Sequence, residues 1–170
     1  MAPISIILAR REHLTAIPAI ELACTRLFAE SDLPQSIRYR VSEKADLNEA
    51  IRDGRLWVAL HAGTPVGFAL ADVLDGEAHL DELDVLPEFG RRGIGSRLTR
   101  HVINWASDEG FRTLSLVTFR HVPWNAPFYE KLGFATVSLE EYGPELIERL
   151  EEEDRLGIDI DNRVAMRLEL

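Results

Sequence analysis

A glycine-rich turn with two arginines stands near the middle of the sequence, in the run LDVLPEFGRRGIGSRL at residues 83–98. Apolar residues at helical spacing follow it, so the turn opens a helix. The first backbone N–H groups of a helix have no intrahelical partner, and the macrodipole adds a partial positive charge. Such a turn can hold a diphosphate, and the candidate ligands are Arg91, Arg92, Gly93, Ile94, Gly95 and Ser96. An ordinary strand-to-helix turn with solvated arginines is the alternative, since neither the Rossmann nor the P-loop pattern fits.

Acidic residues and a histidine crowd the segment just before this turn, AHLDELDV at residues 78–85. Strand alternation places His79, Asp81 and Val85 on one side. Glu82 and Asp84 then face the other side, and a strand bulge would shift this parity in favour of Glu82. These groups can accept protons, or they can be polar rim residues that contact water. Because a third ligand at a recognisable spacing is missing, the His79 and Asp81 pair predicts no metal site.

The composition limits the classes of protein that fit. The chain has 170 residues, 29 acidic against 19 basic, and a net charge of −10. We expect one domain over residues 1–170, and such acidity argues against binding of nucleic acid or of an anionic membrane surface. The apolar run at residues 4–9 is too short to cross a bilayer and predicts a first strand. With a single cysteine, Cys24, no internal disulfide is possible, and we expect a cytoplasmic protein.

Alternating helices and strands must position these groups. Helical spacing predicts a first helix from Ile17 through Leu27 and Phe28, with Cys24 on its buried stripe. Further helices are predicted near residues 45–51, 94–105, 126–132 and 144–155, and strands at 4–9, 56–60, 65–73, 78–85, 111–119 and 163–168. The strand, helix and strand around the glycine turn form a crossover, so these two strands are parallel neighbours in a mixed, mostly antiparallel sheet.

Two motifs in order, VLPEFGRRGIGSRL and then NAPFYEKLGF, resemble the GNAT superfamily of N-acetyltransferases. The family signature reads Q/R-x-x-G-x-G/A, which Gly93 and Gly95 match, while Gly90 stands at its first position. The resemblance implies an α+β fold of three α/β layers, with a six- or seven-stranded sheet covered by helices on both faces. It also implies acetyl-CoA as co-substrate, no metal, and direct attack by a primary amine in a ternary complex.

The resemblance also implies roles for particular residues. The pantetheine arm lies between two diverging strands along Leu83, Asp84 and Val85, with the Val85 N–H directed at the thioester carbonyl. Asn125 lies beside the coenzyme. Tyr129 matches the tyrosine of Y-x-x-x-G-F and is the general acid for the leaving thiolate, its alternative being an aromatic that packs with Phe128. The base positions of the family fall on Asp81 and His79, with Glu82 replacing them if the strand is bulged.

Alternatives remain at the level of function. The same fold can serve a non-catalytic acyl-CoA sensor. The acceptor is a small-molecule or peptide amine that the sequence does not specify, and a homodimer is left open because dimers are common in the family. An acyl-enzyme is not expected, since Cys24 is predicted to be buried on a helix away from the site.

Overall fold

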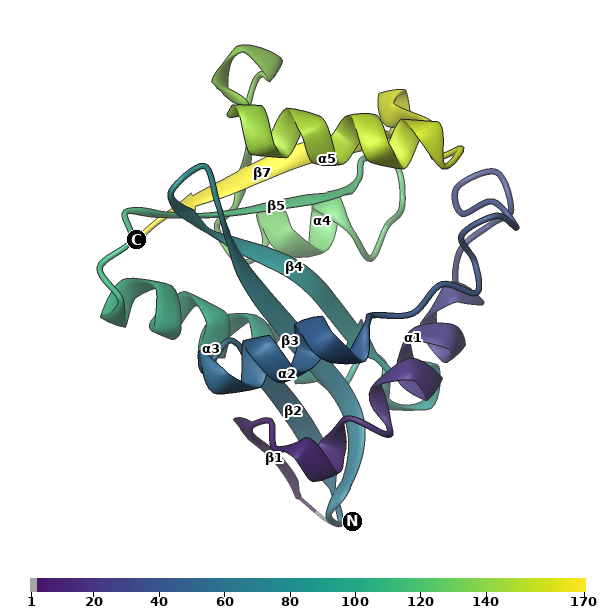
Figure 1. Ribbon diagram of the computed structural model, residues 1–170, viewed down its shortest axis with the longest axis vertical. Helices are drawn as coiled ribbons and strands as arrows, with labels where there is room; N and C mark the ends of the chain where they lie inside the picture. The colour runs from purple at the N-terminus through teal and green to yellow at the C-terminus, as the bar shows by residue number, and fades with distance from the viewer. Residues whose placement is uncertain (1–2) are drawn as a thin grey trace.

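A computed structural model describes residues 3–170 and contains a seven-stranded mixed sheet (Figure 1). The strand order is β1-β2-β3-β4-β5-β7-β6. The strands are β1 (Ile4–Leu8), β2 (Leu56–His61), β3 (Thr64–Leu74), β4 (Glu77–Val85), β5 (Thr113–Phe119), β6 (Ala135–Thr136) and β7 (Arg163–Glu169). Within the described chain only β4 and β5 pair in parallel. The predicted mixed, mostly antiparallel sheet is confirmed.

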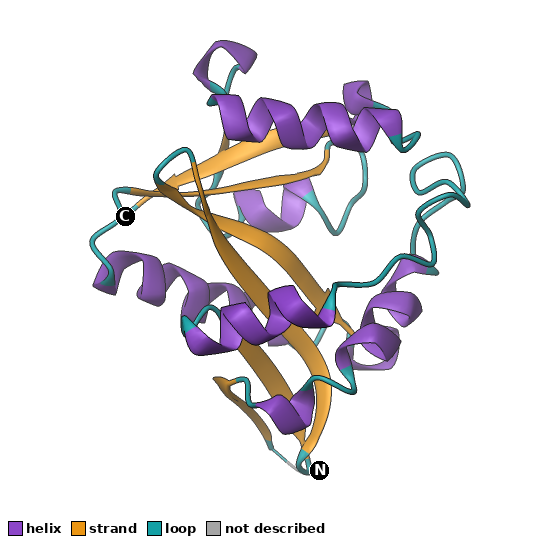
Figure 2. Cartoon of the chain, in the orientation of Figure 1, coloured by secondary structure: helices purple, strands orange, loops and turns teal. Residues whose placement is uncertain are grey.

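Helices cover both faces of this sheet, as predicted (Figures 1 and 2). The helices are α1 (Ile17–Thr25), α2 (Lys44–Arg52), α3 (Ile94–Asp108), α4 (Ala126–Glu130) and α5 (Pro144–Arg155). Short 3-10 turns lie at Arg11–His13, Pro87–Phe89, Leu139–Glu141 and Ile160–Asn162. One core packs α3 against the sheet through Ile94, Leu98 and Val102, and a second core packs α1 and α2 against the other face. Among residues 3–170, no helix has the length and apolar character that a bilayer crossing needs.

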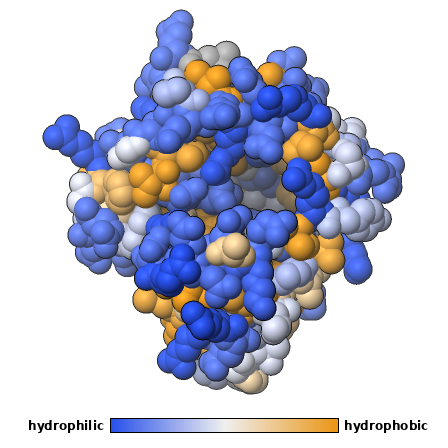
Figure 3. Space-filling view, in the orientation of Figure 1, coloured by the Kyte–Doolittle hydropathy of each residue, from blue (hydrophilic) through white to orange (hydrophobic). Residues whose placement is uncertain are grey.

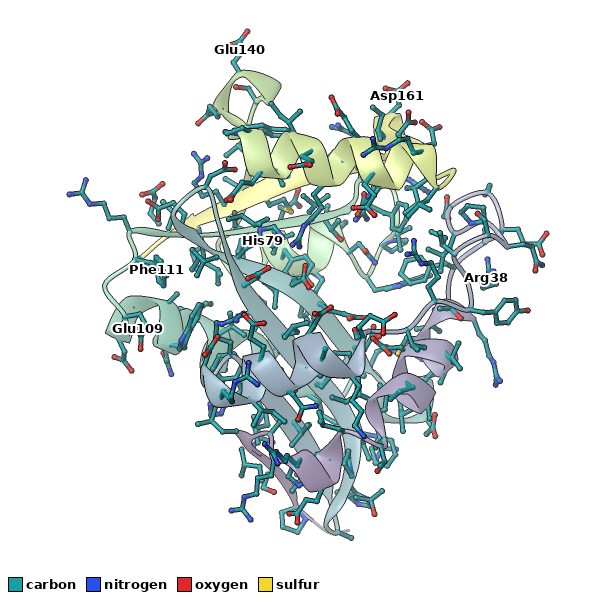
Figure 4. All side chains as sticks on the ribbon, in the orientation of Figure 1. Arg38, His79, Glu109, Phe111, Glu140 and Asp161 are labelled. Atoms are coloured by element: carbon teal, nitrogen blue, oxygen red, sulfur yellow. The ribbon has the colours of Figure 1, made fainter. Side chains whose placement is uncertain are left out.

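The first helix is shorter than predicted. It ends at Thr25, so Leu27 is exposed and Phe28 lies in the following loop. The reason is tertiary: the Arg38 guanidinium donates to the carbonyls of Thr25 at 2.8 Å, Phe28 at 3.2 Å and Leu33 at 2.8 Å (Figure 4). These bonds satisfy carbonyls that a longer helix would use, and they hold the loop over the sheet.

A β-bulge in β4 reverses the predicted sides of that strand. Leu80 pairs with Ala71 and Glu82 pairs with Leu70, so Asp81 is an extra residue without a partner on β3. Because a bulge shifts the parity, Val85 packs toward the α3 core on the same face as Leu80. His79, Glu82 and Asp84 therefore share the opposite face, and the predicted grouping of His79 with Val85 is wrong.

The β3–β4 hairpin holds α5 through long-range bonds. At the turn, Oδ1 and Oδ2 of Asp75 accept the N–H groups of Glu145 at 2.9 Å and Leu146 at 3.2 Å, which caps the start of α5. Arg149, further along α5, contacts Asp81 and lies 3.2 Å from Asp72. Three carboxylates of the hairpin, those of Asp72, Asp75 and Asp81, therefore bind α5. Strand alternation alone predicts that such side chains are exposed to solvent.

The close contact of Gly67 in β3 with the backbone of β4 predicts a stability effect. A Cβ on Gly67 would lie 2.7 Å from the Asp84 carbonyl oxygen, which a strand pair cannot accommodate without moving apart. We expect Gly67→Ala to lower the free energy of unfolding by about 1–3 kcal/mol. Urea denaturation followed by circular dichroism measures this change, and an unchanged midpoint would show that the strands separate at no cost.

Candidate active site

A large cavity lies beside the end of β4, between α1, the start of α3 and α4, where β4 no longer pairs with β5. The two strands pair only from Ala78 to Leu80 and from Leu114 to Leu116, and they diverge beyond these residues. The cavity measures about 790 Å³. Of the residues predicted to contact the coenzyme, it is lined by Leu83, Asp84, Val85, Arg91, Gly93, Ile94, Gly95, Ser96 and Asn125. Arg92 does not line it: its guanidinium donates to the Glu88 carbonyl at 3.1 Å and lies 5.0 Å from the centre of the Phe89 ring.

The start of α3 offers free N–H groups to this cavity. Gly93 occupies the N-cap with φ +74°, a left-handed conformation that favours glycine, and no side chain in the described part of the chain caps the helix there. The first bond of helical type runs from the Arg97 N–H to the Gly93 carbonyl at 3.1 Å. The N–H groups of Ile94, Gly95 and Ser96 are therefore available to an anion. A Cβ on Gly95 would lie 3.4 Å from the Phe128 ring, at van der Waals contact, so the start of α3 lies directly beside α4.

The end of β4 presents its backbone to the gap between the strands. The Leu86 N–H donates to the Val66 carbonyl of β3 at 2.9 Å. Backbone groups of an antiparallel strand alternate in direction, so the N–H and C=O of Val85 face away from β3. The Val85 carbonyl accepts the Cys24 thiol at 3.3 Å, while its N–H lies on the side predicted for the thioester.

Cys24 lies at the site, against expectation. It is buried, as predicted, but it lines both this cavity and the second one described next. The last turn of α1 lies against β4, where the Cys24 thiol donates to the Val85 carbonyl. Burial and the nearby charge of Asp84 raise the pKa of the Cys24 thiol. It stays protonated at neutral pH, and a protonated thiol is a poor nucleophile.

A second, smaller cavity of about 280 Å³ adjoins the first. It lies under the loop that follows α1, between α1, β4, β5 and Arg163 of β7. In the view of Figure 3, which has the orientation of Figure 1, a hollow lies near the centre of the molecule and is bordered largely by hydrophilic residues. The residues that line both cavities are Cys24, Phe28, Leu83, Asp84, Asn125 and Tyr129. The two spaces therefore meet beside the end of β4.

Glu82 lines the second cavity in a cluster of carboxylates. Its Oε2 lies 3.2 Å from the Ser42 Oγ, and Ser42 in turn bonds the buried Glu21 of α1. Burial raises the pKa of Glu82, and the charges of Asp84, Glu21 and Asp81 raise it further. Burial and the charge of Glu21 raise the pKa of Asp84 to about 7. Carboxylates of this kind hold a proton much closer to neutral pH than ordinary ones do.

Asp81 and His79, the other predicted bases, are engaged elsewhere. The Asp81 carboxylate borders the second cavity but contacts the Arg149 guanidinium of α5. His79 lines neither cavity and is 2% exposed, with its Nδ1 2.8 Å from the Ser115 Oγ (Figure 4). Burial, aided by the charge of Arg149, lowers the pKa of His79 to about 3. Because of the bulge at Asp81, Glu82 lines the second cavity, and no arginine among residues 3–170 pairs with it. His79 lies outside the cavity and Asp81 is paired with Arg149.

The comparison with known proteins decides the family. The model of the acetyltransferase (GNAT) family matches residues 20–134. The chain belongs to the GNAT family. Its sequence is similar to that of YafP, an uncharacterized N-acetyltransferase of Escherichia coli K12, with 29% identity over 116 residues that make up 68% of this chain and 69% of YafP.

Solved GNAT-type structures share the fold. The PaiA N-acetyltransferase of Thermoplasma acidophilum, in complex with coenzyme A, has a TM-score of 0.72 at 18% identity, with 99% of each chain covered. The N-acetylglutamate synthase of Neisseria gonorrhoeae, complexed with coenzyme A and N-acetyl-glutamate, has a TM-score of 0.73 at 20% identity. That match covers 100% of this chain, which spans only 36% of the synthase. At these identities the likeness shows the fold alone, which is the predicted one.

Tyr129 of this GNAT chain both packs and faces the cavities, so the two interpretations of the sequence are compatible. Its ring lies 4.9 Å from that of Phe128 and 5.7 Å from that of Phe134. Its hydroxyl makes no hydrogen bond to any of residues 3–170, and burial, with the charge of Asp84, raises its pKa. The phenol therefore keeps its proton at neutral pH. A general acid must hold a proton before the reaction.

The short helix α4, which carries Tyr129, follows Asn125 and is followed by a turn that closes at Gly133. Asn125 holds the predicted N-cap position, but its side chain does not cap the helix. Its Oδ1 instead accepts the Thr118 hydroxyl at 2.6 Å, which ties α4 to the end of β5. α4 ends at Glu130, two residues before the predicted end, while Gly133 in the following turn has the predicted left-handed conformation, with φ +97°.

Sequence reasoning missed the part of this GNAT site that lies on α1 and on the loop after it. Glu21 is 4% exposed, and Ser42, Arg40 and Phe28 also contribute to the second cavity or its carboxylate cluster. One signal was available. Glu21 stands four residues after Ile17 and directly after Ile20, so helical spacing places a carboxylate on the buried stripe of α1. A charge on a buried stripe needs a partner or a function.

A metal site is not evident. Among the described residues, no three His, Cys, Asp or Glu side chains are grouped so as to hold a metal ion.

Proposed function

We propose that the protein transfers an acetyl group from acetyl-CoA to a primary amine by direct attack in a ternary complex. The observation that carries this proposal is the meeting of two cavities beside Val85 and Tyr129, one lined by the start of α3 and one by carboxylates. The larger cavity suits the coenzyme, because the N–H groups at the start of α3 can bind a diphosphate and the residues Leu83–Val85 of β4 line its wall. The smaller cavity suits the acceptor.

The amine enters as an ammonium ion, because its pKa is about 10, and must lose a proton before it attacks. We assign this step to Glu82, acting directly or through water, with the negative cluster attracting the cation. The Val85 N–H stabilises the negative charge that develops on the thioester oxygen. Tyr129 then protonates the departing thiolate. Small amines and peptide N-termini both satisfy this chemistry.

The state of Cys24 supports direct transfer without an acyl-enzyme. Its thiol lines both cavities, but its raised pKa and its bond to the Val85 carbonyl keep it protonated. The amine therefore attacks the thioester itself.

Two measurements test the proposal in sequence. Trp124 lines the coenzyme cavity and is 50% exposed, so we expect coenzyme A to change its fluorescence and to raise the melting temperature. A panel of amines, amino acids and short peptides is then incubated with acetyl-CoA, and released thiol is quantified. We expect at least one amine to be acetylated, with the product confirmed by mass spectrometry. Binding of coenzyme A without turnover of any amine would favour the sensor function, and failure to bind it would refute both.

A further inference from the structure

Ser42 connects two carboxylates of the acceptor cavity. It precedes α2, and its N–H donates to Oε1 and Oε2 of Glu21 at 3.0 Å and 3.2 Å. Its Oγ contacts Oε1 of Glu21 and lies 3.2 Å from Oε2 of Glu82. One hydroxyl group therefore touches a carboxylate from α1 and a carboxylate from β4.

The number of protons decides what this contact can do. A serine hydroxyl carries one proton, and its oxygen can accept others. While Glu82 is ionised, the Ser42 hydroxyl can donate to Glu82 or to Glu21, but not to both. Once Glu82 is protonated, it can donate to the Ser42 Oγ while Ser42 donates to Glu21. The bond that Ser42 donates to an ionised Glu82 is charge-assisted, whereas the bond that a protonated Glu82 donates to Ser42 is neutral and weaker.

We propose that Ser42 is a positioning residue for Glu82. Its hydroxyl donates to Glu82 while that carboxylate is ionised, and it donates to Glu21 once Glu82 is protonated. In this step an N–H bond of the acceptor ammonium breaks, the proton passes to Glu82 directly or through water, and the electron pair stays on the amine nitrogen. The inference rests on the proposed function, in which Glu82 is the base.

The surroundings of Glu82 set the direction of the effect. Burial raises its pKa, as do the charges of Asp84, Glu21 and Asp81, whereas the Ser42 hydrogen bond lowers it. Removal of the Ser42 hydroxyl should therefore make Glu82 hold its proton to higher pH. The charged and titratable groups around it are Glu21 and Cys24 of α1, Arg40 of the loop, Asp81 and Asp84 of β4, Tyr129 of α4 and Arg163 of β7.

The test measures the protonation of the Glu82 carboxyl group directly. The full chain is labelled with ¹³C at the glutamate carboxyl groups, and the Glu82 signal, identified by its loss in Glu82→Gln, is titrated by NMR without any substrate. We expect Ser42→Ala to raise the Glu82 midpoint by about one pH unit, the worth of one hydrogen bond to a carboxylate. Ser42→Thr restores the hydroxyl and should restore the midpoint. Ser36→Ala is the matched control, because it removes a serine from the same loop whose Oγ donates to the Leu156 carbonyl at 2.8 Å.

The same variants are then assayed with acetyl-CoA and the best amine of the panel. We expect the acid limb of kcat/KM against pH to move upward with the NMR midpoint in Ser42→Ala and to return in Ser42→Thr. Transfer by folded Ser42→Ala with an unmoved Glu82 midpoint or an unmoved acid limb would overturn this inference alone. A moved midpoint with no transfer by the wild-type protein would overturn the proposed function, and with it the catalytic part of this inference.

Discussion

Tyr129→Phe should lower kcat for acetyl transfer by about 100-fold or more while leaving the affinity for coenzyme A almost unchanged. The substitution removes only the hydroxyl, whose proton the departing thiolate needs. The ring contacts with Phe128 and Phe134 remain, so α4 keeps its place. Steady-state kinetics give kcat, and the fluorescence titration of Trp124 gives the affinity for coenzyme A.

Tyr39→Phe is the matched control for this prediction. Tyr39 is 69% exposed and lines neither cavity, so the loss of its hydroxyl should leave kcat unaffected. If kcat is equal in Tyr129→Phe and wild type, Tyr129 is not the general acid and its ring serves packing alone.

Glu82→Gln should lower kcat/KM by about 100-fold or more and abolish the acid limb of the pH profile that Glu82 imposes. A base works only when it is ionised, so wild-type activity falls as the pH drops through the pKa of Glu82. Burial and the charges of Asp84, Glu21 and Asp81 raise that pKa, so the loss should begin well above pH 4, where an ordinary glutamate titrates. Rates from pH 5 to 9 in wild type and variant measure both effects.

Stability provides the folding control for this variant. A group with a raised pKa in the folded state adds stability below its unfolded pKa, and that stability is lost as the pH rises through the folded pKa. Glu82→Gln removes this loss, so the variant should be at least as stable as wild type at neutral and alkaline pH, as thermal denaturation can show. Glu43→Gln, at an exposed residue beside Ser42, is the matched control for activity. A Glu82→Gln variant with an unchanged acid limb would exclude Glu82 as the base and direct attention to Asp84, whose pKa is about 7.

The elements of the fold could largely be predicted from the sequence, because each depends on local signals. The turns at Asp75-Gly76 and at Gly133 have the positive φ angles that their residue types favour, and the helix predicted at residues 144–155 is α5. The end of α1 could not be predicted. It depends on Arg38, which reaches back to the carbonyls of Thr25 and Phe28 from a loop with no helical or strand periodicity.

The sequence by itself determined the segment that we propose to bind the coenzyme. The N–H groups, the glycines and the Val85 amide belong to one continuous segment, and backbone donors at a helix start need no distant partner. The acceptor half was decided by the tertiary structure. One extra residue at Asp81 reversed the faces of β4, and Glu21, Ser42 and Glu82 come from three separate segments. Which carboxylate meets an arginine and which remains in the cavity depends on how those segments pack, because electrostatic contacts act across space and leave no periodic pattern along the chain.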